Sequence, residues 1–178
     1  MNFFFRRGQV WVETVIYTLI GLALMGVVLA ILTPKIKEFR DRAVIEQSIE
    51  SLNVIDSKVN EILDAPGNKR KIELAIDKGR FVVNSTKDSI YFVIDGTSVR
   101  YSEPGVSLEI GRINVTTEKL AEKYRVTLEL NYLHNITFGG LDSPIINEFS
   151  PTSLPYKFFV ENKGLVNSKV QVDITEGG

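Results

Sequence analysis

The residue with the most informative chemistry is a single carboxylate, Glu13, at the edge of a long apolar run. No charged residue occurs from Thr14 to Leu32. As an α-helix these residues would be about 28 Å long, close to the hydrocarbon thickness of a bilayer. Removing a carboxylate from water is costly unless a partner group stabilises it. Glu13 is therefore either a boundary residue in water or a residue that awaits a partner.

A second feature is the junction Arg6-Arg7-Gly8-Gln9, which comes just before the apolar run. A secretory signal peptide has an apolar region of about 7–15 residues, followed by a cleavage site of small residues. The run here is longer, and no such site follows it. Gly8 instead precedes the run, which points to a segment of a different kind.

Gly8, then Gln9, then Glu13 and an uncharged helix together resemble the class III signal of type IV pilins. The resemblance is to the archaeal variant, which begins Gln-x-Ser-x-Glu after the cut. Trp11 stands here in place of the usual serine, and Tyr17 in place of the leucine four residues after the glutamate. The resemblance covers about residues 6–64.

This resemblance implies that a prepilin peptidase removes residues 1–8 by cutting after Gly8, so that Gln9 becomes the first residue. It implies that residues 9–33 form a transmembrane helix that later packs in the core of a surface filament of identical or related subunits. Glu13 would pair there with the α-amino group of a neighbouring Gln9. Such a pair offsets part of the desolvation cost of both charges, so its main effect would be to set the register.

An uncleaved membrane anchor is the alternative interpretation. Many membrane proteins begin with a few basic residues and an apolar helix. The chain would then be an anchored extracellular β-domain that acts as an adhesin or a binding module. The two hypotheses differ at the N-terminus, which is Gln9 in the first and Met1 in the second.

Two sequence features, the charges that flank the helix and the sequons, bear on which side of the membrane the domain lies. They give opposite indications. A count of Lys and Arg in the two flanks favours a cytoplasmic domain, but long domains cross a membrane largely regardless of flank charge. The domain carries three Asn-x-Ser/Thr sequons, at Asn84, Asn114 and Asn135. We expect an extracellular domain, with glycan on at least one of the three.

The residue patterns of enzymes and cofactor sites are missing. His134 is the only histidine, and no phosphate-binding glycine loop is present. Asp142, Asp173 and Glu176 lack the dense spacing of a calcium loop. The chain has no cysteine for a disulfide or a thiolate metal site, and its net charge of −1 does not indicate nucleic-acid binding. We expect a structural protein without a cofactor rather than an enzyme.

A single helix is predicted from Gln9 to Leu63. Pro34 can kink it. Residues 34–64 are expected to form an amphipathic second half that packs on a globular head, because apolar residues recur at steps of three and four. These are Ile45, Ile49, Leu52, Ile55, Val59 and Ile62. The turn-forming residues 64–68 end the pattern.

Residues 65–178 are expected to form a β-rich head, since the apolar period changes to two after Lys71. Residues 124–132 are the clearest strand, and residues 139–156 read as a long loop. Hairpins are predicted for 72–76 with 80–84, for 90–94 with 97–101 around Asp95-Gly96, for 107–110 with 112–115, and for 157–160 with 169–174 around residues 162–164. The predicted fold is α+β, a long helix followed by an antiparallel β-sandwich or small β-barrel.

Overall fold

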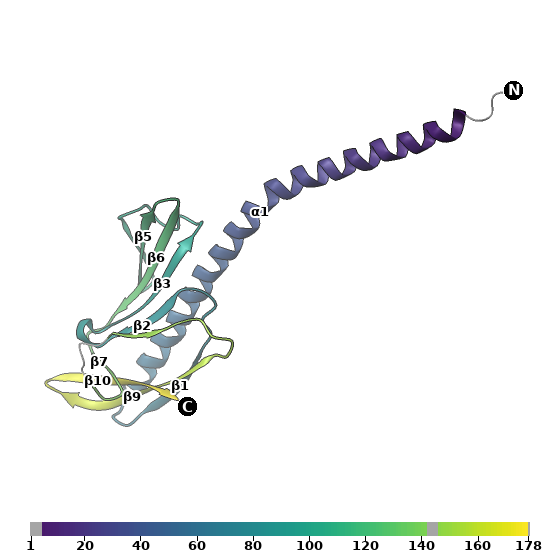
Figure 1. Ribbon diagram of the computed structural model, residues 1–178. Helices are drawn as coiled ribbons and strands as arrows, with labels where there is room; N and C mark the ends of the chain where they lie inside the picture. Colours follow the sequence, from purple (N-terminus) through teal and green to yellow (C-terminus); the bar gives the residue numbers. More distant parts are fainter. Residues whose placement is uncertain (1–4, 142–145, 178) are drawn as a thin grey trace. The chain divides into compact units, whose positions relative to one another are not determined.

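The first element is a single long helix, α1, which runs from Phe5 to Ile62 and contains Pro34. A computed structural model describes the backbone of residues 5–141 and 146–177, and the side chains of residues 11–141 and 146–177. The helix ends within one residue of the predicted position, and the strands of the head follow it (Figure 1). The prediction of a long N-terminal helix before a β-rich head is therefore confirmed.

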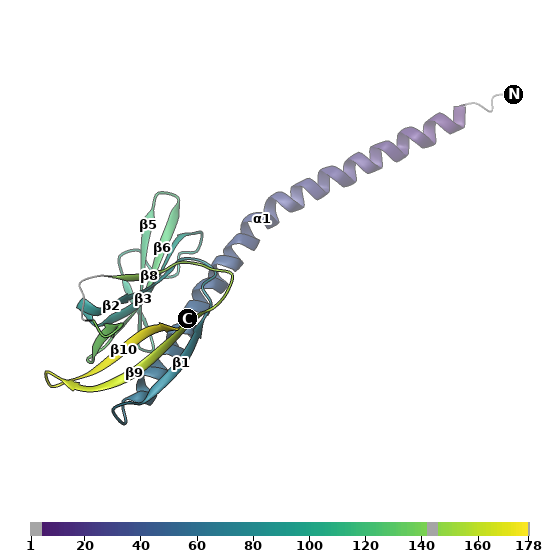
Figure 2. The same cartoon turned by 60° about the horizontal axis from the view of Figure 1, so that its bottom comes forward.

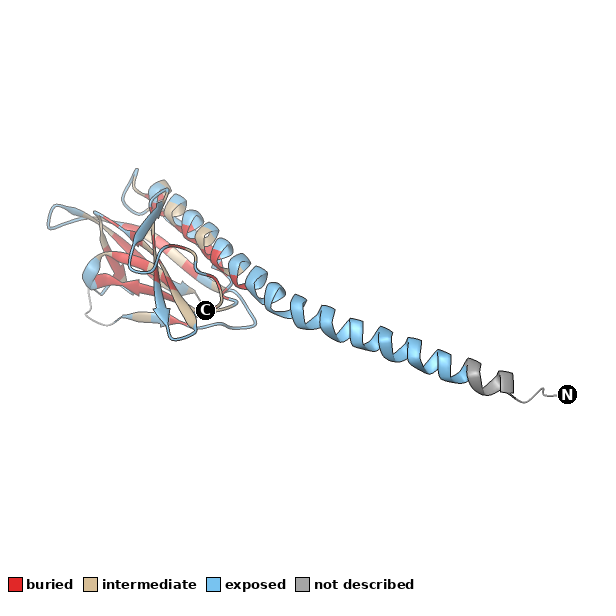
Figure 3. Ribbon diagram, turned by 90° about the horizontal axis from the view of Figure 1, so that it is seen from above, coloured by how far each residue is buried: buried red, intermediate tan, exposed pale blue. Residues whose placement is uncertain are grey.

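The chain divides into two units, residues 1–40 and residues 41–178, and the boundary falls inside α1. Every described side chain of the first unit, from Trp11 to Arg40, is exposed (Figure 3). Burial begins at Asp41 and continues through the predicted apolar stripe, of which Ile45, Leu52 and Val59 are fully buried. The packed part of the helix thus starts later than Pro34.

The strands of the head lie in two sheets. The four-stranded sheet has the order β1 (Lys69–Leu74), β9 (Tyr156–Val166), β10 (Lys169–Gly177) and β7 (Asn135–Phe138). The six-stranded sheet has the order β4 (Ser107–Ile110), β5 (Ile113–Leu120), β6 (Lys123–Asn131), β3 (Ser89–Thr97), β2 (Arg80–Asn84) and β8 (Asn147–Phe149). A short 3-10 helix, η1 (Ser85–Lys87), joins β2 to β3. Among the described strands, all pairs are antiparallel except β7 with β10.

The two sheets and the second half of α1 share one hydrophobic core. Phe81 of β2 and Phe158 of β9 link the sheets directly, with ring centroids 5.6 Å apart. Strands β1, β9 and β10 lie beside the C-terminal end of α1 in both Figures 1 and 2. Of the two arrangements expected from the sequence, the head has two separate sheets rather than a barrel.

The first predicted hairpin is wrong. Strand β1 pairs with β9, and β2 pairs with β3 and β8, so residues 77–79 connect two sheets instead of turning between neighbouring strands. Gly79 has a φ of +87°, and a Cβ at this position would lie 2.4 Å from the carbonyl oxygen of Val93. The glycine therefore permits a close backbone approach at the crossover.

Two further turns lie elsewhere than predicted. Asp95 and Gly96 form an irregularity inside β3, which pairs with β6, so they do not make a hairpin turn. The closing hairpin of β9 and β10 is correct, but it turns at Asn167 and Ser168, which both have positive φ. The hairpin of β4 and β5 and the long strand β6 are confirmed. The expected loop 139–156 contains β8, and residues 142–145 lie outside the described residues.

Candidate membrane and assembly segment

The first half of α1 exposes apolar side chains on every face. From Trp11 to Leu32 the large apolar residues are between 38% and 71% exposed. Within the described residues, this is the one helix long and apolar enough to cross a membrane. A helix that is apolar all round is stable in lipid or when packed against other apolar surfaces, and water does not favour it.

The hydroxyl groups in this segment are compatible with an apolar environment. Thr18 Oγ1 donates to the carbonyl oxygen of Thr14 at 2.8 Å, and Thr33 Oγ1 donates to that of Leu29 at 2.7 Å. These bonds run back to the preceding turn of the same helix. The hydroxyls of Thr18 and Thr33 thus need no external partner, which suits a span in which every polar group must be satisfied internally.

Glu13 lies exposed on α1, one turn before Tyr17. The Tyr17 hydroxyl lies 3.5 Å from Glu13 Oε1, longer than the about 2.5–3.0 Å of an ordinary O–H···O hydrogen bond, so this contact is weak. No ion pair with Glu13 occurs among the described side chains. A neutral, exposed hydroxyl compensates little of the cost of placing a carboxylate in an apolar environment.

The predicted cleavage junction lies within α1 by its backbone, because the helix begins at Phe5. The side chains of residues 1–10 lie outside the described side chains, and these residues include Gln9 and the expected leader, residues 1–8. The geometry of the junction with Glu13 therefore remains a prediction from the sequence.

The three sequon asparagines differ in their surroundings. Asn84 is buried, and its Oδ1 accepts a hydrogen bond from the backbone N–H of Lys87, which caps η1. Asn114 is half-buried on β5, with a glutamate beside it on each neighbouring strand. Asn135 is half-buried at the start of β7, but its sequon residue Thr137 is buried and donates to Asp173 Oδ1 at 2.8 Å. Asn84 is thus not a solvent-facing acceptor in the folded head.

The residues considered for catalysis or metal binding do not come together in the described part of the chain. His134 is half-buried between β6 and β7, Asp173 is buried and bonded to Thr137, and Glu176 is exposed near the end of β10. Asp142 lies outside the described residues. No group of three or more metal-ligating side chains occurs among the residues that the structure describes.

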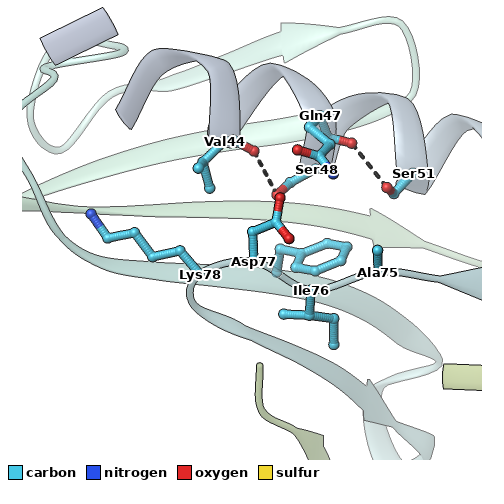
Figure 4. A pocket seen from close by; sticks show the side chains of 9 residues that line it. Val44, Gln47, Ser48, Ser51, Ala75, Ile76, Asp77 and Lys78 are labelled. Carbon is cyan, nitrogen blue, oxygen red and sulfur yellow. Dashed lines mark hydrogen bonds between the residues drawn. The ribbon is translucent and has the colours of Figure 1, made fainter. Parts of the chain in front are cut away.

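A small hollow lies between α1 and the connection from β1 to β2 (Figure 4). Two serine hydroxyls on its helical wall are used within the helix, since Ser48 donates to the Val44 carbonyl and Ser51 to that of Gln47. Its volume of about 10 Å³ is close to the minimum for one water molecule. This hollow cannot hold a substrate.

Three polar contacts, which the sequence did not reveal, hold the second half of α1 to the sheets. The first is made by Asp41. It is 5% exposed; its Oδ1 lies 2.6 Å from Lys78 Nζ, and its Oδ2 accepts the backbone N–H of Ser98 at 2.7 Å. Burial alone raises the pKa of this carboxyl, but the bonds from Lys78 and Ser98 outweigh burial and leave the pKa below its usual value.

The second contact joins the helix to the six-stranded sheet. Asp56 Oδ1 lies 2.6 Å from Arg112, which also donates to the carbonyl oxygen of Asn131 and lies over the ring of Tyr132. Burial, together with the nearby Asp56 carboxylate, raises the pKa of Tyr132 far above its usual value, so the phenol stays neutral.

The third contact is Asn162 of β9, which caps the C-terminal end of α1. Its Nδ2 donates to the carbonyl oxygens of Ile62 at 3.0 Å and Leu63 at 3.4 Å. Its Oδ1 accepts the backbone N–H of Gly164 at 2.8 Å. A local sequence signal for such a cap does not exist, because the partners lie about a hundred residues apart.

The first half of α1 is therefore apolar and exposed, and the second half is held to the sheets of the head by polar contacts. Comparison of this chain with protein-family models, curated proteins and solved structures found no match.

Proposed function

We propose that this chain is the structural subunit of a type IV pilus-like surface filament and that it polymerises through the first half of α1. The observation that carries the proposal is the uniformly exposed apolar surface from Trp11 to Leu32, with the single carboxylate Glu13 at its edge. A membrane satisfies this surface before assembly, and the same surface of neighbouring subunits satisfies it afterwards.

The mechanism uses two charges. A prepilin peptidase cuts after Gly8, removes Arg6 and Arg7 with the leader, and frees the α-amino group of Gln9. Glu13 of one subunit pairs with this amino group on a neighbour. Either charge alone in an apolar core would bear its full desolvation cost, so the pair favours one register between subunits over others.

The head stays outside the cell throughout, first above the membrane and then on the surface of the filament. The sequons at Asn114 and Asn135 support this assignment, because Asn-x-Ser/Thr acceptor sites are used in secreted domains. The contacts at Asp41, Asp56 and Asn162 hold the second half of α1 to the sheets.

Electron microscopy of Glu13→Ala in the native host tests the proposal. We expect a correctly cut, membrane-resident protein that fails to polymerise or forms poorly ordered filaments. Glu46→Ala is the matched control, because Glu46 is an exposed glutamate on the same helix and its loss should leave filaments intact.

Normal filaments from Glu13→Ala would show that the Glu13 carboxylate has no role in assembly. An intact Met1 on the native protein, measured by mass spectrometry, would favour the alternative of an uncleaved, membrane-anchored adhesin or binding module.

A further inference from the structure

A basic segment follows the apolar span directly. We call Lys35–Arg40 the basic collar. It contains three cations, one acid and two apolar residues, and all of its side chains are exposed. Phe39 is 71% exposed and Ile36 is 50% exposed. An exposed phenylalanine among cations is unfavourable in water and typical of the interface between lipid and water.

The charges of the basic collar are only partly compensated. Glu38 lies 3.0 Å from Lys35 Nζ, so this pair is neutral as a unit. Lys37 and Arg40 form no ion pair with any described side chain. Two exposed cations therefore remain at the end of the span.

The spacing of aromatic residues along α1 fits a bilayer with its headgroups. Trp11 and Phe39 are both 71% exposed, and they stand at opposite ends of the apolar run. The rise between them is about 42 Å in an α-helix, and a bilayer with its headgroup layers is about 40–45 Å thick. When Trp11 lies in one headgroup layer, the basic collar lies in the other.

From this charge and spacing we propose that the basic collar binds anionic phospholipid headgroups in the leaflet on the side of the head. Lys37 and Arg40 reach the phosphates while their aliphatic stems and Phe39 remain at the acyl boundary. A basic residue near an anionic membrane surface strengthens attraction about fivefold, and added salt weakens it. The proposal rests on the membrane span of the proposed function and is independent of filament assembly.

The test uses the full-length chain in vesicles of phosphatidylcholine and phosphatidylglycerol. Trp11→Phe with Phe39→Trp moves the single tryptophan of the chain into the basic collar. Bromine on the acyl chains of either lipid quenches tryptophan that lies close to it. We expect brominated phosphatidylglycerol to quench more strongly than brominated phosphatidylcholine at equal mole fraction.

Neutralising the two cations with Lys37→Gln and Arg40→Gln should reduce the relative affinity for phosphatidylglycerol by up to about 25-fold, since two charges act at about fivefold each. The control pair Lys87→Gln and Lys119→Gln removes two exposed lysines of the head and should change nothing.

Two kinds of result would overturn the proposal, and only the second would also refute the membrane span. Equal quenching by both lipids, or a preference that survives neutralisation, would refute anionic selection while leaving the span intact. The absence of quenching by either lipid would show that position 39 is not at the membrane, and the membrane span of the proposed function would then fail as well.

Discussion

Replacing Asn162 by alanine should destabilise the head more than any exposed substitution on α1. Asn162 is 2% exposed, and its side chain satisfies the Ile62 carbonyl at 3.0 Å and the Gly164 N–H at 2.8 Å. Each buried polar group left without a partner costs about 1–3 kcal/mol, and the N–H of Gly164 costs less than the Ile62 carbonyl because Gly164 is only half-buried. We therefore expect a loss of about 2–4 kcal/mol in the free energy of unfolding.

For a unit of this size such a loss corresponds to a decrease in Tm of roughly 6–16 °C. The measurement is a thermal melt of the detergent-solubilised full chain, followed by circular dichroism in the strand region. Asn53→Ala is the matched control, because Asn53 is exposed on the same helix and its loss should cost less than about 0.5 kcal/mol. If Asn162→Ala has the same Tm as Asn53→Ala, the cap does not stabilise the head, and our account of how α1 ends is incorrect.

Three further results are expected. The folded-state pKa of Asp41 lies below its unfolded value, so its stabilising contribution is present above about pH 3.9 and is lost as the pH falls through the folded pKa. Urea unfolding at several pH values should therefore show that the free energy of unfolding decreases more steeply with acid in the wild type than in Asp41→Asn. An equal decrease in the two proteins would contradict this. Gly8→Val should retain the leader, because a site shaped for glycine excludes a branched side chain, and an unchanged mature N-terminus by mass spectrometry would disprove it. Glycopeptide mapping of the native protein should find glycan at Asn114 or Asn135 and not at Asn84, which is buried. A glycan at Asn84 would show that burial does not decide which sequon is used, and the bare polypeptide mass would refute glycosylation of the head.

The sequence by itself determined the features whose cause is local. Neighbouring residues on one helix determine the apolar run, the apolar stripe from Ile45 to Ile62 and the turn-forming residues 64–68 that follow. The helix α1 accordingly ends within one residue of the predicted position. The alternation of residues 124–132 likewise predicted β6, because alternate residues of a strand face opposite sides of the sheet. The candidate assembly residue Glu13 was also visible from local context alone, and its role remains a proposal.

Only the tertiary structure decided which strands pair and which polar groups hold the helix to the head. A glycine turn between two short strands suggested a hairpin, but β1 pairs with β9, some ninety residues later, because the apolar faces of the two sheets must both close on α1. The roles of Asp41 and Asn162 follow from contacts with Ser98 and Ile62, which lie far away in the sequence. Residue type and local spacing carry no information about such partners, since they meet only when the core is formed.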